Sequence, residues 1–150
     1  MASYFLLYKT AFYSSWEEGS LKAMKVYDFY GEYQCTDIDQ LMNRLQVRSK
    51  HMSNDYELRH EAGYPLMAIL VKDALACVHF FKDENDAGCY AFTGAAEQTK
   101  DENIVFNLGS EDAETVVSYK MVISVEKAYT VAKAFFNTSQ MSSDVEWYQL

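Results

Sequence analysis

The sequence predicts a single α+β domain, in which an antiparallel β-sheet carries two main α-helices packed on it. Two observations predict this fold class. Apolar runs separated by short polar turns fill the middle of the chain, and two separate segments have helical apolar periodicity. The 150 residues are 49% hydrophobic and 15% aromatic, which fits one domain with a real core and excludes a disordered acidic chain. Helices segregated from hairpins indicate α+β rather than α/β.

The first expected elements are short. Tyr4–Phe12 fits an edge strand, which could also pair with a second copy of the chain, and Trp16–Ser20 fits a turn. Met24–Tyr30 fits a strand that leads into a turn at Gly31.

The first helix is expected over Asp37–Val47. Thr36 is a good N-cap residue, and Asp39 follows it by three positions, close to a capping box. The apolar residues that form one face at helical spacing are Ile38, Leu41, Met42 and Leu45.

The central part of the chain reads as a hairpin of buried strands. Leu66–Val71 is a continuous apolar run, Lys72-Asp73 interrupts it, and Ala74–Phe81 is a second run. A polar turn follows, and Cys89–Phe92 is the next expected strand. The remaining expected strands are Ile104–Leu108, Lys120–Ile123 and Val145–Tyr148.

The second helix is expected over Val125–Phe136. Ser124 fits the N-cap, and Glu126 lies in the first turn, where the helix dipole favours an acid. Asn137 is the expected stop. The buried stripe consists of Ala128, Val131, Ala132, Phe135 and Phe136.

The negative charge is concentrated in one segment. The chain has 13 basic and 22 acidic residues, a formal net charge of −9. The segment Asp83–Glu114 holds nine acids against Lys100 alone, so it carries −8 and the remainder carries −1. This balance argues against direct binding of nucleic acid or of an anionic membrane and favours a basic partner. The alternative is that these acids are solvated loop residues.

Residues that would carry catalysis or hold a cofactor are not arranged in a recognisable pattern. Cys35, Cys77 and Cys89 are an odd number at wide spacing, which favours reduced thiols over a disulfide framework. Cys77 and His79 are close in sequence, but two ligands do not make a metal site. We therefore expect no metal, no cofactor and a binding protein rather than an enzyme. The N-terminus has neither a basic start nor a long apolar run, so we expect a cytoplasmic protein.

An ordered set of motifs resembles the first immunity-protein family of bacterial polymorphic toxin systems. The set ends in Val122-Ile123-Ser124, an aromatic-ended helix with Ala134-Phe135-Phe136-Asn137-Thr138, and Val145-Glu146-Trp147. Its middle is formed by Gly63-Tyr64-Pro65-Leu66, the turn at Lys72-Asp73, and Tyr90–Gly94. The chain departs from the family at Ser139 and Met141, where Gly and Pro are frequent, and residues 1–25 resemble an N-terminal extension, with residues 26–150 as the immunity-protein domain.

The resemblance implies a small antitoxin that binds a cognate toxin and blocks its active site or substrate cleft. Toxins of such systems are often nucleic-acid deaminases and sometimes nucleases, so the resemblance implies a partner with a basic cleft. The motif residues Phe135, Phe136, Trp147 and Tyr90 are interpreted as structural, with Tyr90 also a possible anchor. The expected partner-binding residues are Asp83, Glu84, Asp86, Tyr90, Phe92, Asp101, Glu102, Glu111 and Asp112. Two alternatives stay open: a small intracellular enzyme with a tyrosine-lined pocket, and an acidic adaptor or chaperone for a secreted effector. The free protein is expected to be a monomer or a homodimer.

Overall fold

The computed structural model describes residues 23–60, 63–92 and 102–150. The expected edge strand Tyr4–Phe12, the turn Trp16–Ser20 and nearly all of the N-terminal extension lie outside the described residues.

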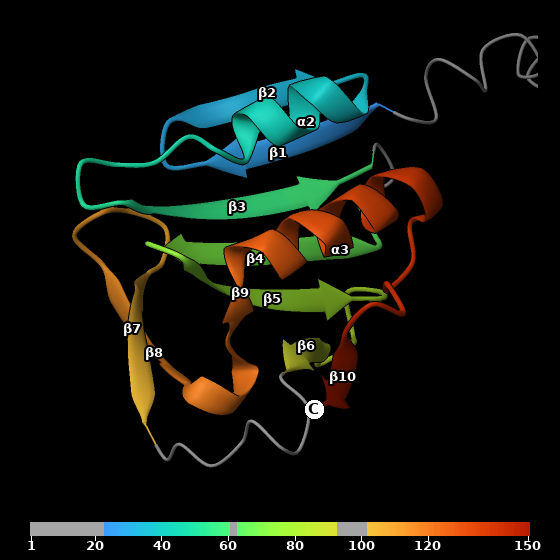
Figure 1. The fold of residues 1–150 in the computed structure, drawn as a ribbon. Helices are drawn as coiled ribbons and strands as arrows, with labels where there is room; N and C mark the ends of the chain where they lie inside the picture. Colours follow the sequence, from blue (N-terminus) through green and yellow to red (C-terminus); the bar gives the residue numbers. More distant parts are fainter. Residues whose placement is uncertain (1–22, 61–62, 93–101) are drawn as a thin grey trace, which may run out of the picture.

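An eight-stranded antiparallel sheet forms the body of the molecule and confirms the predicted α+β class (Figure 1). Its strand order is β10-β6-β5-β4-β3-β1-β2, and β9 pairs with β5. The strands are β1 (Met24–Asp28), β2 (Gly31–Cys35), β3 (Ser53–Arg59), β4 (Leu66–Lys72), β5 (Leu75–Phe81), β6 (Cys89–Phe92), β9 (Ile123–Ser124) and β10 (Glu146–Gln149). The central hairpin was predicted to within a residue or two.

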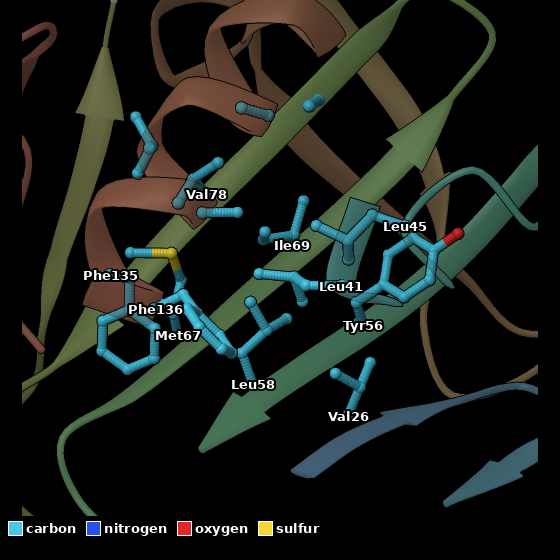
Figure 2. Packing of buried hydrophobic residues seen from close by; sticks show 14 of the residues in the cluster. Val26, Leu41, Leu45, Tyr56, Leu58, Met67, Ile69, Val78, Phe135 and Phe136 are labelled. Carbon is cyan, nitrogen blue, oxygen red and sulfur yellow. The ribbon is translucent and has the colours of Figure 1, made fainter. Parts of the chain in front are cut away.

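Two helices, α2 (Ile38–Arg44) and α3 (Val125–Thr138), cover one face of this sheet (Figure 1). Their apolar stripes pack on the inward residues of the strands, because side chains alternate between the two faces of a strand. The resulting core includes Tyr56, Leu58 and Phe135, all without solvent exposure. Figure 2 shows how side chains from β3, β4 and β5 meet those of both helices. Burial of each such side chain contributes roughly 1.5–3 kcal/mol.

The ends of both helices differ from the predictions. Asp37, not Thr36, is the N-cap of α2, since its carboxylate accepts a hydrogen bond from the Gln40 backbone N–H. Thr36 instead donates its backbone N–H and hydroxyl to the Gln40 side chain. The helix ends at Arg44 rather than Val47, and α3 continues through Asn137 to Thr138.

A second, two-stranded sheet packs on the opposite face. It is the hairpin of β7 (Asn103–Asn107) and β8 (Glu114–Ser118), and it contacts β3 and β4. Phe106 from this hairpin is fully buried with Leu70 and Cys77 of the main sheet. We call the sheet face opposite the helices, which carries Asp55, Leu70, Cys77, His79 and Tyr90, the distal face.

Three strands were not predicted, and one of the predicted strands was wrong. The missed strands are β2, β3 and β8. The expected strand Lys120–Ile123 is a 3-10 helix, η2 (Tyr119–Met121), followed by the short β9. The Ser118 side chain accepts a hydrogen bond from the Lys120 backbone N–H, and this cap favours the helical turn.

Within the described residues, no helix is both long and apolar enough to cross a membrane.

Candidate functional site

The distal face contains a pocket between the main sheet and the β7–β8 hairpin. Its volume is about 400 Å³. Strands β3 to β6 supply its floor, and the hairpin and η2 supply the opposite wall. Its lining includes Asp55, Ala68, His79, Phe81, Tyr90 and Val116.

Asp55 places a carboxylate in this pocket. Its Oδ2 accepts a hydrogen bond of 2.8 Å from the Gly109 backbone N–H at the tip of the β7–β8 hairpin. Burial raises the pKa of the Asp55 carboxyl, and the Gly109 N–H partly opposes that shift. Asp55 therefore ties the hairpin to β3 and supplies the pocket with an acidic group.

Three rings from β5 and β6 lie together on the floor of the pocket, where His79 stacks on Tyr90 and is tilted against Phe81. The His79 ring centroid lies 3.9 Å from that of Phe81 and 3.9 Å from that of Tyr90. His79 Nε2 also lies 3.0 Å from the Ala87 carbonyl oxygen. Burial lowers the pKa of His79, so the ring is neutral at pH 7. Gly88 leaves room for the His79 ring, because a Cβ at this position would collide with that ring and lie 2.9 Å from the Phe80 carbonyl oxygen.

The first group of predicted acids lies in the turn between β5 and β6. Asp83 and Glu84 are exposed, and Asp83 accepts a hydrogen bond from the Asn85 backbone N–H. Asp86 accepts from the backbone N–H groups of Lys82 and Gly88, and these bonds lower the pKa of its carboxyl. Asp86 thus stabilises the turn, whereas Glu84 is directed to solvent.

The second group of predicted acids lies at the other end of the molecule. Glu111 and Asp112 form the tip of the β7–β8 hairpin, and Glu111 accepts a hydrogen bond of 3.4 Å from the Tyr30 hydroxyl. Glu102 precedes β7, and its carbonyl accepts from the Tyr119 backbone N–H. Asp101 lies outside the described residues.

The register of the sheet separates these two groups. The hairpin tip contacts Asp55, whose neighbours across the sheet are Leu70 and Cys77. The β5–β6 turn follows Phe81, four residues further along β5, or about 13 Å of strand. Figure 1 shows the hairpin tip at one side of the sheet and the β5–β6 turn at the other. Of the predicted acids that the structure describes, one group lies in the β5–β6 turn and another at the hairpin tip, with the distal pocket between them, whereas Glu102 lies at the end of the β7–β8 hairpin opposite to its tip.

The predicted aromatic anchors lie on the distal face. Tyr90 is half-buried at the pocket, and Phe92 is half-buried further along β6. Tyr148 of β10, which is 50% exposed, pairs with Tyr90 across the strands and makes an edge-to-face contact with Phe92. Phe135 and Phe136 are core residues, and the half-buried Trp147 packs on the core edge-to-face with Phe80.

Sequence reasoning missed Asp55 and His79 as site residues. The available signal was the alternation in Ser53–Arg59, where the apolar Tyr56 and Leu58 are separated by polar residues. That pattern is typical of a strand with one buried face and would have placed Asp55 on the other face. It would not have revealed the hairpin that encloses the carboxylate.

The thiol of Cys77, which lines the pocket, is not a nucleophile near neutral pH. Burial raises the pKa of the Cys77 thiol to about 12, so the thiolate that would act as a nucleophile does not form near neutral pH. In the part of the chain that the structure describes, no three His, Cys, Asp or Glu side chains are grouped to hold a metal ion.

Comparison with known proteins gives one informative match. The chain is 27% identical over 125 residues to the double-stranded DNA deaminase immunity protein of Burkholderia cenocepacia (strain H111). The match covers 82% of this chain and 97% of that protein. The chain is a homologue of that immunity protein. No family model matches the chain.

This homology confirms the resemblance seen in the sequence motifs. It spans almost the whole length of the relative. Immunity proteins are non-enzymatic inhibitors, which agrees with the prediction of a binding protein rather than an enzyme.

Proposed function

We propose that this chain is an immunity protein that binds a cognate DNA deaminase toxin in the cytoplasm and blocks its active site or substrate cleft. The observation that carries this proposal is the homology over 97% of a double-stranded DNA deaminase immunity protein. The sequence-based prediction of a binding protein that uses neither catalysis nor a cofactor is consistent with this proposal.

The charge distribution supports such a partner. A protein that acts on DNA carries basic residues where phosphates bind. The exposed acids Glu84 and Asp112 lie on either side of the distal pocket, in the β5–β6 turn and at the hairpin tip. Complementary potentials accelerate encounter and fix the register of the complex. In this proposal the two acidic groups steer the basic cleft of the toxin onto the distal face.

The aromatic residues supply the apolar part of the proposed interface. Tyr90, Phe92 and Tyr148 lie next to one another on β6 and β10. Tyrosines give large contact areas at low cost in conformational entropy and are enriched at interfaces. These residues are the proposed anchors, and only a few of the surrounding contacts would contribute strongly to affinity.

Co-expression with the toxin candidate encoded next to this gene tests the proposal. The expected result is rescue of growth and a tight 1:1 complex that co-elutes in size-exclusion chromatography. Absence of both rescue and complex would contradict the proposal. An adaptor for a secreted effector would instead bind a secretion signal and not the isolated toxic domain, so that domain is the form to use.

A further inference from the structure

We propose that the distal pocket receives an arginine side chain of the toxin, with the Asp55 carboxylate as its counter-ion. This inference rests on the proposed function and adds to it the chemistry of the contact. A cavity of about 400 Å³ falls within the range of protein pockets that enclose a ligand and is large enough for a long side chain with its flanking backbone.

The charge of the pocket favours a cationic ligand. The described residues that line the pocket include the Asp55 carboxylate and no lysine or arginine. The Asp55 carboxylate accepts only one hydrogen bond, at Oδ2 from Gly109, among the described residues. Oδ1 is thus free to accept a bond from a guanidinium, in the charge-assisted geometry that is strongest for carboxylates.

Two bases elsewhere on the distal face already have partners, and a third, Lys72 of β4, neither lines the pocket nor forms an ion pair in the described part of the chain. Lys25 lies 3.4 Å from Glu32, and Arg59 pairs with Glu57. Neither side chain lines the pocket. A cation from outside the chain is therefore the natural counter-ion for Asp55.

The side chains that line the pocket favour a guanidinium over an ammonium. Phe81, His79 and Tyr90 present adjacent aromatic rings, and Val116 presents an apolar surface. The planar guanidinium of arginine stacks on aromatic faces, and its alkyl stem packs on apolar side chains. The more strongly hydrated ammonium of lysine is less suited to such walls. His79 is neutral at pH 7 and does not repel a cation.

A toxin that acts on DNA would supply a suitable arginine. Arginine side chains that contact phosphates are expected in a protein that acts on DNA. Insertion of one of them into the distal pocket would remove it from the substrate-binding surface. The acids at both ends of the pocket would steer that surface into place.

Asp55→Asn tests the proposal with the smallest change of shape. Asparagine keeps an oxygen that can accept the Gly109 N–H, so the hairpin should remain attached. We expect the Kd for a catalytically inactive form of the cognate toxin to rise about 10- to 100-fold, mainly through faster dissociation. Glu126→Gln makes the same charge change at an exposed position on the helical face, and its Kd should change less than about twofold. Unfolding midpoints of both variants report whether the fold is intact.

A second variant separates the pocket from its charge. Ala68→Leu fills the pocket floor without altering any ionisable group, and it should weaken binding to a similar extent. In addition, replacing each toxin arginine and lysine by methionine in turn should identify one arginine whose effect is non-additive with Asp55→Asn in a double-mutant cycle.

The outcomes distinguish this inference from the proposed function. If the wild-type protein binds the toxin and the Kd values of both Asp55→Asn and Ala68→Leu differ from the wild-type Kd by less than twofold, the pocket proposal is overturned and the immunity function stands. Coupling of Asp55 to a toxin lysine would overturn the choice of arginine. Failure of the wild-type protein to bind the toxin at all would contradict the proposed function itself.

Discussion

Single residues decide how the distal face is constructed. Gly88 has a φ of +94° and leaves room for the His79 ring, which packs against Phe81 and Tyr90. Asp55 joins β3 to the hairpin through the Gly109 N–H. Asp86 closes the β5–β6 turn with two backbone N–H groups. Each of these contacts depends on an atom that sequence pattern alone does not position.

The buried imidazole of His79 predicts a pH dependence of stability. Burial lowers its pKa below the ordinary value of 6.5, so the unfolded chain binds a proton first as the pH falls. The stabilising contribution is therefore complete above about pH 6.5 and decreases as the pH falls toward the folded pKa. His79→Phe keeps an aromatic ring in the stack and removes this linkage.

Urea unfolding at pH 7.5 and pH 5.5 measures the effect. The wild type should lose more stability between these two values than His79→Phe does. A further pair of measurements at pH 7.5 and 8.5 is the control, since His79 is neutral there in both states. Equal losses in the two proteins between pH 7.5 and 5.5 would contradict the assignment of a lowered pKa.

At the scale of the elements, apolar periodicity predicted most of the helices and strands that have other elements packed on both sides. The strand Cys89–Phe92 and the start of α3 at Val125, with Ser124 as N-cap, were predicted to the residue. β3 was missed because its outward positions hold Asp55, Glu57 and Arg59, which give it the composition of a loop. β2 lies at the edge of the sheet and has one fully buried residue, Cys35, so little apolar signal marks it.

The C-terminal end of α3 carries a strain that a substitution can relieve. Ser139 is the C-cap and has a left-handed φ of 58°, and its backbone N–H donates to the Phe135 carbonyl. A residue with a Cβ is disfavoured in this conformation, whereas glycine is not. Ser139→Gly should therefore stabilise the protein by about 0.5–1 kcal/mol.

Thermal or urea unfolding checks this prediction. Ser139→Ala is the matched control, because it removes the hydroxyl and retains the Cβ, and it should give no stabilisation. If Ser139→Gly is less stable than Ser139→Ala, the left-handed cap is not under strain.

At the scale of the whole molecule, most of the acids of the segment Asp83–Glu114 that the structure describes lie in two places. One group lies in the β5–β6 turn and the other at the tip of the β7–β8 hairpin. Their separation exceeds the Debye length of about 8 Å at physiological ionic strength, so the two groups act on a partner almost independently.

Independent groups predict additive effects on association with the toxin. Glu84→Lys and Asp112→Lys should each lower the association rate constant several-fold at low salt, and the double variant should show the product of the two effects. Asp86 is left unchanged because its carboxylate stabilises the turn. Glu126→Lys makes the same charge change at an exposed position on the helical face and serves as the control.

Stopped-flow or surface-plasmon measurements at two salt concentrations provide the rates. The differences should shrink at high salt, since exposed charges are screened. An association rate that responds equally to Glu126→Lys would contradict the role of the distal face.

The sequence by itself determined the central hairpin, the two helices, the fold class and the excess of acid between Asp83 and Glu114. These follow from local periodicity, capping residues and charge counts, which depend on neighbours a few positions apart. The tertiary structure alone decided that the described acids of the β5–β6 turn and of the hairpin tip lie apart and that Asp55 lies in a pocket between them. Asp55 and Gly109 are 54 positions apart, and only the packing of the β7–β8 hairpin on β3 and β4 brings them together. Long-range packing, rather than composition, gives this chain its candidate binding site.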